Sequence, residues 1–213
     1  MTQLHRYVMF GPQGSGKGTQ SALLAEYLHI QHISTGELFR NAIQNATPLG
    51  KAIAADMKSG KLVTDDSVNK LVREEFQRRI LFDGYILDGY PRTLVQTEYL
   101  ETLAAPSMAI VLELTDDDAV LRIAGRLVCS GCGATYHLTA KKPAVANVCD
   151  NCGGVLHMRE DDNEQAVRAR LALYHKETEP LLSYYDNQHK LVRVDAAPAV
   201  DVVAASIRSA LKV

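Results

Sequence analysis

The glycine-rich stretch VMFGPQGSGKGTQ near the start of the chain has the residue types of a loop that binds phosphate. Two glycines separated by four residues and followed by lysine are present as Gly11, Gly16 and Lys17. The next residue is Gly18, so the hydroxyl that usually follows the lysine comes one place later, at Thr19. Such a loop turns backbone N–H groups toward one point at a helix N-terminus, and the lysine adds a compact positive charge. We expect a phosphate site here rather than a plain glycine-rich turn.

A carboxylate follows one of the apolar runs of the sequence. Asp88 ends the run YILD, and the carboxyl ends of parallel strands lie together at one edge of a sheet. In that position a carboxylate can hold Mg²⁺ through bound water beside a nucleotide. An ordinary turn at the end of a strand explains the same residue equally well.

Several arginines lie beside glycine turns, helix starts or the cysteine-rich segment: Arg40, Arg92, Arg122, Arg126, Arg159 and Arg170. Any one of them fits an ordinary solvated or salt-bridged surface residue. Together they indicate a site for more than one polyphosphate, because guanidinium groups can hold two phosphate chains that otherwise repel each other.

The sequence contains no motif that supplies a general base. An acceptor that is itself a phosphate needs none, since its oxygen is anionic at neutral pH.

Four cysteines form two knuckles, CSGC and CDNC, each followed by glycine. They are Cys129, Cys132, Cys149 and Cys152. Their spacing is typical of a structural zinc site with four thiolate ligands. Iron, a redox role and paired disulfides remain as alternatives. Because four protein ligands leave no open position on the metal, we expect it to stiffen a segment too small for a core of its own.

Strands and helices alternate along the sequence. Apolar runs predict five strands, at RYVMF, IQHIS, YILD, MAIVLEL and KLVRV. Helical periodicity follows them, and Pro180 is expected to kink or interrupt a long helix. Ser34 with Glu37, and Thr93 with Gln96, are candidate helix-opening capping boxes. The order of these elements predicts an α/β fold with a parallel sheet covered on both faces.

The composition limits the classes of partner. The chain has 213 residues, a formal net charge of −2 and 46% hydrophobic residues, which suits one globular domain with a small insertion. This balance gives no general attraction to nucleic acid or to an anionic membrane. The apolar runs are too short to span a bilayer, and the N-terminal residues lack the apolar stretch of a signal peptide. We therefore expect a cytoplasmic protein.

Taken together, these motifs resemble the adenylate kinases, in their long form with a metal-bearing lid. The stretches GSGKGTQ, ISTGELFR, GKLVTDD, LDGYPRT, RIAGRLVC, TYH and REDDNEQAVRARL stand in that family's order and at its spacing. The resemblance implies a P-loop kinase fold, a three-layer α/β/α core with a five-stranded parallel sheet, a helical insert that binds the nucleoside monophosphate (NMP) and a small lid insert. The core would comprise residues 1–33, 64–124 and 163–213, the NMP-binding domain residues 34–63, and the zinc-bearing lid residues 125–162.

The resemblance also implies roles for individual residues. Because the family uses G-K-G-T in its phosphate loop, Thr19 is no defect. The implied ATP-binding residues are Gly14, Ser15, Gly16, Lys17, Gly18, Thr19, Arg122, Arg126, Thr135, Tyr136 and the backbone near Ala197. The implied AMP-binding residues are Thr35, Arg40, Lys61, Leu62, Val63, Gly89, Tyr90, Pro91, Arg92, Gln96, Arg159 and Arg170. Catalytic roles would fall on Lys17, Asp88, Arg92, Arg126, Arg159 and Arg170. Asp161 and Asp162 match carboxylates that hold Arg159 and Arg170 when the lid closes.

Two positions depart from the family's pattern. Gln13 stands where proline is usual, which alters the stiffness of the loop before Gly14. The family's lysine before the proline of the last turn is missing, and Ala197 lies in its neighbourhood. A backbone contact to the adenine base does not need that side chain.

The acceptor base is indicated by Thr35 and Gln96, because the related pyrimidine kinases typically have alanine and asparagine at these positions. We therefore expect a monomeric adenylate kinase that interconverts ATP plus AMP with two ADP, with Mg²⁺ bound to ATP and a structural Zn²⁺ in the lid.

A kinase of the same fold acting on another monophosphate is the nearest alternative. A nucleotide-gated module whose zinc knuckles bind nucleic acid is a second one. That module needs a basic, aromatic-lined insert, whereas only two lysines lie between the first and last cysteines.

Overall fold

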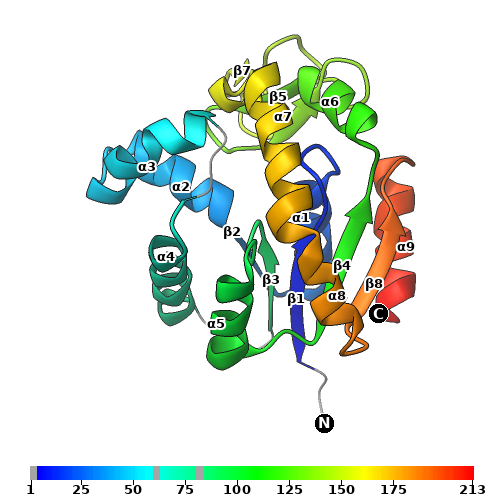
Figure 1. Cartoon of the computed structure of the whole chain (residues 1–213). Coiled ribbons are helices and arrows are strands. Elements are labelled where there is room, and N and C mark those ends of the chain that lie inside the picture. Colours follow the sequence, from blue (N-terminus) through cyan, green and yellow to red (C-terminus); the bar gives the residue numbers. More distant parts are fainter. Residues whose placement is uncertain (1–3, 60–62, 80–83) are drawn as a thin grey trace.

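A five-stranded parallel sheet forms the centre of the molecule (Figure 1). The computed structural model describes residues 4–59, 63–79 and 84–213. The strands are β1 (His5–Phe10), β2 (Gln31–Ser34), β3 (Gly84–Asp88), β4 (Met108–Glu113) and β8 (Leu191–Asp195). Their order across the sheet is β2-β3-β1-β4-β8, and each pairing is parallel. The five strands predicted from the apolar runs are therefore confirmed.

The central strand β1 supplies side chains to two hydrophobic cores, one on each face of the sheet. Val8 and Phe10 belong to one core, and Tyr7 and Met9 belong to the other, because successive side chains of a strand point to opposite faces. The helices α1 (Lys17–Leu28) and α9 (Val200–Leu211) cover one face, and α5 (Leu94–Ala104) and α8 (Pro180–Asp186) cover the other. The expected three-layer α/β/α arrangement is thus confirmed.

Two helices project from the core after β2 (Figure 1). They are α2 (Thr35–Gln44) and α3 (Pro48–Ser59), and the chain returns through α4 (Asp65–Arg78), which packs against α5. The capping box predicted at the start of α2 is wrong, since Ser34 makes no cap hydrogen bond and instead donates its hydroxyl to Asp88 Oδ2 at 3.4 Å. Of the box predicted at α5, the cap itself is confirmed, because Thr93 Oγ1 accepts a hydrogen bond from the Gln96 backbone N–H. The other half is not formed, since the Gln96 side chain accepts from the Arg92 N–H instead of the Thr93 N–H.

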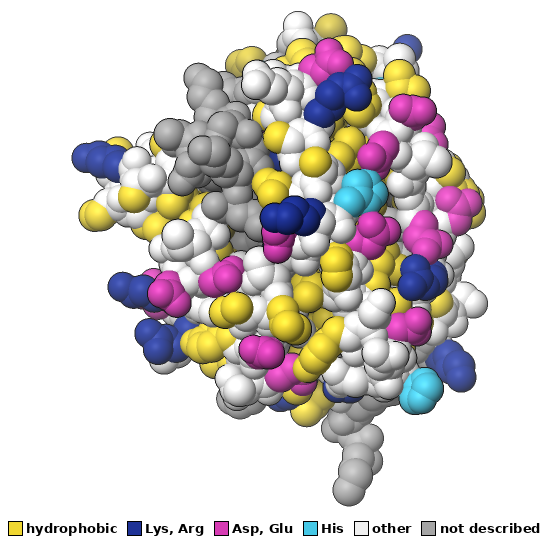
Figure 2. All heavy atoms as spheres, viewed as in Figure 1, with side chains coloured by type: hydrophobic (Ala, Val, Ile, Leu, Met, Phe, Trp, Pro, Cys, Tyr) yellow, Lys and Arg dark blue, Asp and Glu magenta, His cyan; other side chains and the backbone are white. Residues whose placement is uncertain are grey.

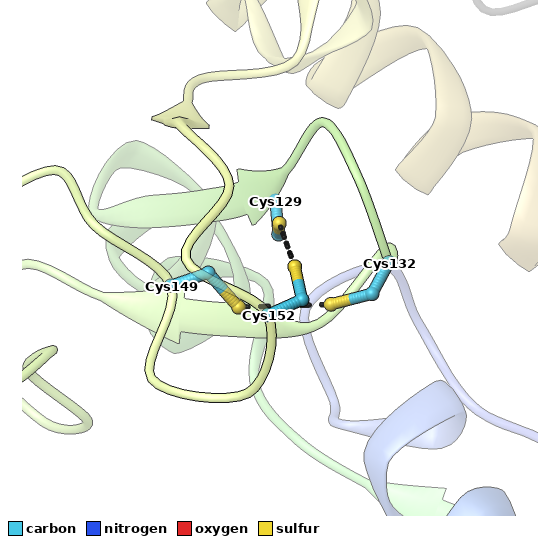
Figure 3. A group of neighbouring side chains, drawn as sticks. All are labelled: Cys129, Cys132, Cys149 and Cys152. Atoms are coloured by element: carbon cyan, nitrogen blue, oxygen red, sulfur yellow. Dashed lines mark hydrogen bonds between the residues drawn. The ribbon is translucent and has the colours of Figure 1, made fainter.

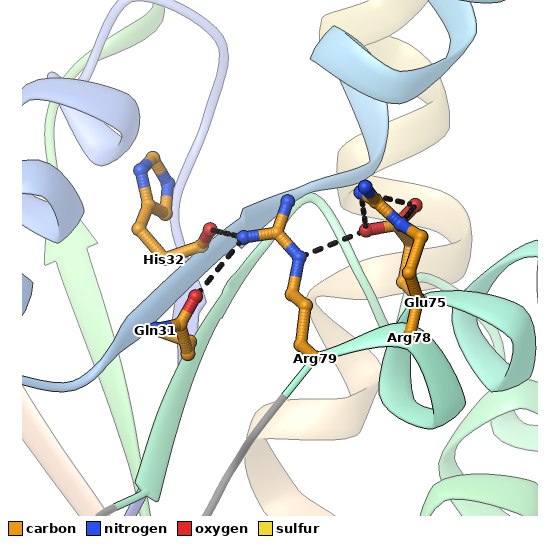
Figure 4. A network of polar contacts seen from close by, with 5 residues as sticks. All are labelled: Gln31, His32, Glu75, Arg78 and Arg79. Carbon is orange, nitrogen blue, oxygen red and sulfur yellow. Dashed lines mark hydrogen bonds and ion pairs between the residues drawn. The ribbon is translucent and has the colours of Figure 1, made fainter.

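Arg79, directly after α4, ties this helix to β2 at the edge of the sheet (Figure 4). Its Nε donates to Glu75 Oε2 at 2.8 Å. Its Nη1 donates to the side chain of Gln31 at 3.2 Å and to the backbone carbonyl of His32 at 3.4 Å. A charged side chain bonded to an edge strand is one way in which proteins prevent unwanted strand pairing. The contact also fixes the strand that leads into α2.

A second, smaller sheet forms the cysteine-rich segment. In it β5 (Arg126–Cys129) pairs antiparallel with β6 (Thr135–His137) and with β7 (Leu156–His157). The helix α6 (Asp116–Ala124) leads into this sheet, and a short 3₁₀ helix, η1 (Glu160–Asp162), leads out of it. Its buried core consists of Leu127, Cys129, Tyr136, Cys149 and Leu156. So small a cluster provides little hydrophobic stabilisation by itself.

A long helical segment returns from the small sheet to the core (Figure 1). It comprises α7 (Glu164–Leu173), a π-helical turn, η2 (Tyr174–Thr178), and α8. The interruption predicted at Pro180 is confirmed, because the π-helical turn lies directly before this proline. A proline in a helix interior removes a backbone donor and clashes with the preceding turn.

The surface carries charges of both signs. Acidic and basic side chains are interspersed over the face shown in Figure 2 rather than gathered by sign. Within the described residues, no helix is both long enough and apolar enough to cross a bilayer.

Candidate functional site

A cavity of about 1040 Å³ lies beyond the carboxyl ends of β1 and β3, between the glycine loop, α2, the small sheet and α7. Topological switch points of this kind are where α/β folds bind ligands. The implied site residues that line it are Gly14, Gly16, Lys17, Gly18, Thr19, Arg40, Val63, Asp88, Gly89, Pro91, Arg92, Gln96, Arg122, Arg126, Thr135, Tyr136, Arg159, Arg170 and Ala197. Ser15, Thr35 and Tyr90 are buried beside it. Lys61 and Leu62 lie outside the described residues.

The glycine loop joins β1 to α1 as predicted. Gly14 has a φ of 88° and presses against α6, where an added Cβ would lie 2.7 Å from the Ala119 carbonyl oxygen, so a larger residue there would push the loop off the helix. Lys17 Nζ donates to the carbonyl oxygens of Gly11 at 2.7 Å and Pro12 at 2.8 Å. Desolvation lowers the pKa of Lys17 to about 8, although the nearby carboxylate of Asp88 acts to raise it. The ammonium group therefore lies in the loop that would hold phosphates.

The glycine before the displaced hydroxyl lies close to Asp88. A Cβ added at Gly18 would lie 3.3 Å from Asp88 Oδ2, so a larger residue there requires a shift of a few tenths of an ångström. The carboxylate at the end of β3 thus occupies the space beside position 18. Thr19, one residue later in α1, lines the cavity. Asp88 therefore faces the glycine loop, in agreement with the placement expected from the end of its strand.

The turn after β3 forms the opposite wall of the cavity. Thr35 is 1% exposed, and its hydroxyl donates to the Gly89 carbonyl at 2.9 Å. Arg92 Nε donates to the same carbonyl at 2.8 Å. Desolvation lowers the pKa of Arg92, against the attraction of Asp88. Thr35 thus supports the 89–92 turn, because its hydroxyl hydrogen is used in the bond to the Gly89 carbonyl.

One residue of this wall was missed by the sequence reasoning. Asp65, in the first turn of α4, accepts a hydrogen bond from Gln96 Nε2 at 2.7 Å and another from Thr93 Oγ1 at 2.9 Å. The Gln96 Oε1 atom accepts from the backbone N–H of Arg92 at 2.8 Å. Asp65 lies 31 positions from Gln96, and no local pattern links the two.

Six arginines line the cavity, from the core, from α2 and from the small sheet: Arg40, Arg92, Arg122, Arg126, Arg159 and Arg170. Burial, followed by repulsion from Arg126 and Arg40, lowers the pKa of Arg159 to about 10. Its Nε is buried and has no hydrogen-bond partner among the described residues. Guanidinium groups brought together in this way favour an anionic ligand between them.

Two carboxylates hold arginines where the small sheet joins α7. Asp162 pairs with Arg126 through both oxygens, with Nε at 2.8 Å from Oδ2. Asp161 pairs with Arg170 at 2.5 Å, and this charge lowers the pKa of Asp161 against the effect of burial. The resemblance implied Arg159 and Arg170 as the partners of these carboxylates. The structure agrees for Arg170 but has Arg126 in place of Arg159. Gln13, the departure in the glycine loop, donates weakly to Asp162 at 3.4 Å.

The far end of the cavity lies at the turn between β8 and α9. Arg122 Nη2 donates to the carbonyl oxygens of Ala196 at 2.8 Å and Ala197 at 2.9 Å. From α1, Gln20 Nε2 donates to the Val200 carbonyl at 2.8 Å. The backbone near Ala197 therefore lines the cavity, and its carbonyl groups face a guanidinium group. A lysine side chain is not needed to form this wall.

The four cysteines converge at one point of the small sheet (Figure 3). Their Sγ atoms all lie within 4.8 Å of one another, with Cys129 and Cys152 at 3.4 Å and Cys132 and Cys149 at 3.6 Å. A tetrahedral zinc ion with Zn–S bonds of about 2.3 Å separates its sulfur ligands by about 3.8 Å. The arrangement therefore fits such an ion. No disulfide is formed among the four residues.

The surroundings of two sulfurs favour thiolates, since the pKa values of Cys129 and Cys149 are lowered. The pKa of Cys152 is raised instead, because the hydrogen bond from the Gly154 backbone is outweighed by those with the neighbouring cysteines. The backbone N–H of Gly131 donates to Cys129 Sγ at 3.3 Å. Burial alone would raise the pKa of the Cys149 thiol, but hydrogen bonds from the Tyr136 hydroxyl and from backbone N–H groups lower it to about 6. The Tyr136 side chain is 3% exposed, and its hydroxyl also accepts from the Asp150 N–H at 2.8 Å. The Tyr136 hydroxyl therefore helps to stabilise the Cys149 thiolate.

Comparison with known proteins gives a consistent result. The family model described as adenylate kinase matches residues 9–190. An adenylate kinase of Treponema denticola is 41% identical over 201 residues, which are 94% of this chain and 96% of the relative. Adenylate kinases of Acidothermus cellulolyticus and Methanocella arvoryzae are 42% and 35% identical over 212 residues, in each case 97% of this chain and 98% of the relative. Matches of this extent include the sheet and both inserts.

Proposed function

The chain belongs to the adenylate kinase family and is a nucleoside monophosphate kinase, and we propose that it transfers the γ-phosphoryl group of ATP to AMP, reversibly, to give two ADP. The observation that carries this proposal is one cavity in which the glycine loop faces the Thr35–Gln96 wall, with six arginines around it. Two anionic nucleotides that must be brought together require this arrangement of positive charge.

On the donor side, the glycine loop from Gly14 to Thr19 binds the phosphates of ATP through backbone N–H groups and the Lys17 ammonium. The adenine base of ATP lies toward Arg122 and the backbone near Ala197. Asp88 and the Thr19 hydroxyl are oxygen donors of the kind that Mg²⁺ prefers, and they would hold the ion that accompanies ATP. When bound, Mg²⁺ supplies charge neutralisation at the transferring phosphate.

On the acceptor side, Arg40 and Arg92 bind the AMP phosphate, and Gln96 contacts its base. Val63 and the Gly89–Arg92 turn complete this pocket, and the roles implied for Lys61 and Leu62 remain part of the proposal. The acceptor oxygen is already anionic at neutral pH, so no residue has to remove a proton. The chemistry then depends on alignment of the two phosphates and on compensation of their charge.

The remaining arginines act at the transferring phosphoryl group. Arg126, Arg159 and Arg170 reach the cavity from the small sheet and α7. Ion pairs with Asp162 and Asp161 orient two of them, Arg126 and Arg170. We propose the corresponding division of the chain, with a core of residues 1–33, 64–124 and 163–213, an NMP-binding domain of residues 34–63 and a lid of residues 125–162. Closure of the lid would exclude water, which competes as an acceptor.

The cysteine cluster is proposed to hold Zn²⁺ as a structural ion. Its four thiolates would fill the coordination sphere, so the ion does not take part in the transfer. The small buried core of the lid supports this role, because the metal would supply stability that so few apolar residues cannot. We further propose that the protein acts as a cytoplasmic monomer, which light scattering and cell fractionation can test.

The proposal is tested by measuring ADP formation from MgATP with AMP, CMP, UMP or GMP as the acceptor. We expect a strong preference for AMP, and we expect it to relax in a Thr35→Ala, Gln96→Asn double variant. Turnover with another monophosphate in place of AMP would favour a kinase of different base specificity. If ATP binds and no acceptor supports turnover, the phosphotransferase proposal fails and a nucleotide-gated binding module, with zinc knuckles that contact nucleic acid, takes its place.

A further inference from the structure

We propose that Asp65 fixes the orientation of the Gln96 side-chain amide and so makes the acceptor pocket select adenine over purines with an oxygen at position 6. The inference rests on the proposed function, since it concerns the base of the acceptor nucleotide. It makes Asp65 a positioning residue that determines specificity through Gln96. Asp65 does not itself have to touch the nucleotide.

The partners of Gln96 determine which way its amide faces. Gln96 is 2% exposed and lines the cavity. A carboxylate can only accept hydrogen bonds, so the amide atom 2.7 Å from Asp65 Oδ1 is the nitrogen. A backbone N–H can only donate, so the atom 2.8 Å from the Arg92 nitrogen is the oxygen. The two contacts act at opposite ends of the amide and favour the same orientation.

The amide keeps hydrogen-bonding capacity for a ligand. Its nitrogen carries two hydrogens and its oxygen two lone pairs. Asp65 uses one hydrogen and Arg92 uses one lone pair. One N–H donor and one acceptor site therefore remain on a side chain that lines the cavity. Adenine presents an amino donor at position 6 and an acceptor at N1, which are complementary to these two groups.

An amide without such partners would not discriminate between the two kinds of purine. Hypoxanthine and guanine present an acceptor at position 6 and a donor at N1, the reverse of adenine. A glutamine that can turn over by 180° about its terminal bond satisfies either pattern. Turning over in this protein would bring the Gln96 oxygen against the Asp65 carboxylate and its N–H groups against the Arg92 N–H. Both contacts would then be lost, which is costly for the Gln96 amide because this side chain is 2% exposed.

Asp65 is itself held in place. Thr93 Oγ1 donates to the same Oδ1 atom at 2.9 Å, and Thr93 is the N-cap of the helix that carries Gln96. Asp65 also lies in the first turn of α4, where the helix dipole favours a negative charge. The acceptor at this position is therefore a fixed feature of the pocket wall.

The test compares AMP with IMP, which differ only in the hydrogen-bonding pattern at positions 6 and 1 of the base. The ratio of kcat/KM for AMP to kcat/KM for IMP is measured at fixed MgATP in the wild-type protein and in Asp65→Asn. An asparagine can donate or accept, so it permits both orientations of Gln96. We expect the ratio to fall at least about tenfold, a change of about 1.4 kcal/mol, through lower use of AMP and higher use of IMP. The KM for ATP should stay unchanged.

Asp66→Asn is the matched control. Asp66 is in the same first turn of α4 and is exposed, so its replacement removes the same charge from the same helix end. Its AMP-to-IMP ratio should equal that of the wild-type protein. If Asp65 only stabilised the fold, Asp65→Asn would lower activity with both acceptors by one factor and leave the ratio constant, and this result overturns the inference.

A second variant guards against a folding defect. Should Asp65→Asn not fold, Asp65→Ser removes the acceptor-only group with a residue suited to a helix start, and the same fall in the ratio is expected. An unchanged ratio in Asp65→Ser counts against the inference in the same way. Failure of the proposed function is distinguishable, because it appears in the wild-type protein as an absence of ADP formation from AMP.

Discussion

Raising the pH through about 8 should lower kcat/KM for ATP, and kcat at saturating ATP should fall only at a higher pH. Lys17 is desolvated in the glycine loop, where it donates to the Gly11 and Pro12 carbonyl groups, and its pKa is lowered to about 8. Only the protonated amine attracts the phosphates of ATP. The free enzyme therefore loses a positive charge from its phosphate site in a range of pH where an ordinary lysine keeps it.

The expected magnitude follows from this pKa. A group with a pKa of about 8 is about 90% protonated at pH 7 and about 10% protonated at pH 9, so kcat/KM for ATP should fall about tenfold over this range. Bound phosphates raise the pKa of Lys17 again, because opposite charges favour the protonated form. The value of kcat at saturating ATP should therefore hold to a higher pH than kcat/KM does.

The assay measures ADP formation at saturating AMP while MgATP is varied, with thermal unfolding recorded at each pH to verify the fold. Lys17→Arg provides the control, because a guanidinium group stays charged over this range. Whatever the residual activity of Lys17→Arg, its kcat/KM for ATP should be constant between about pH 7 and pH 9.5. A wild-type kcat/KM that is constant over this range, or a decline of the same size in Lys17→Arg, would refute the reasoning.

Three further predictions concern stability. Removal of metal by a chelator should lower the melting temperature, while enzyme that is still folded keeps its turnover; a prompt loss of turnover without loss of fold would contradict a structural role for the ion. Hydrogen bonds to Glu179 and then Asp116 raise the pKa of His175, so its stabilising effect is complete below the unfolded pKa of about 6.5 and is lost as the pH rises through the higher folded value. His175→Gln should accordingly lower the melting temperature at about pH 6 and have little effect at about pH 9, and an equal effect at both would contradict this assignment. Arg79→Met removes the link to the edge strand but leaves its carboxylate partner paired with Arg78, so the free energy of unfolding in urea should fall by about 1 kcal/mol. The control Arg78→Met, at a side chain that is 67% exposed, should cost less, and the reverse order would count against the link.

Much of the fold could be predicted because its signals are local. Each strand of the large sheet is a short apolar run, and parallel pairing buries both faces of such runs. The glycine loop is likewise a contiguous pattern between a strand and a helix, and the cysteine spacing needs only two short knuckles. Asp88 could be placed at the correct edge of the sheet because strand ends share that edge. In each of these cases the residues that determine the structure are close together in the sequence.

The sequence by itself thus determined the strands, the phosphate loop and the convergence of the four cysteines. Only the tertiary structure decided which polar groups meet across the cavity. Ser34 donates to Asp88 instead of capping its own helix, and the Tyr136 hydroxyl serves the cysteine cluster. Asp65 reaches Gln96 from a different helix. A side chain can choose among several partners, and the docking of distant elements determines which partner comes within the roughly 3 Å that a hydrogen bond requires.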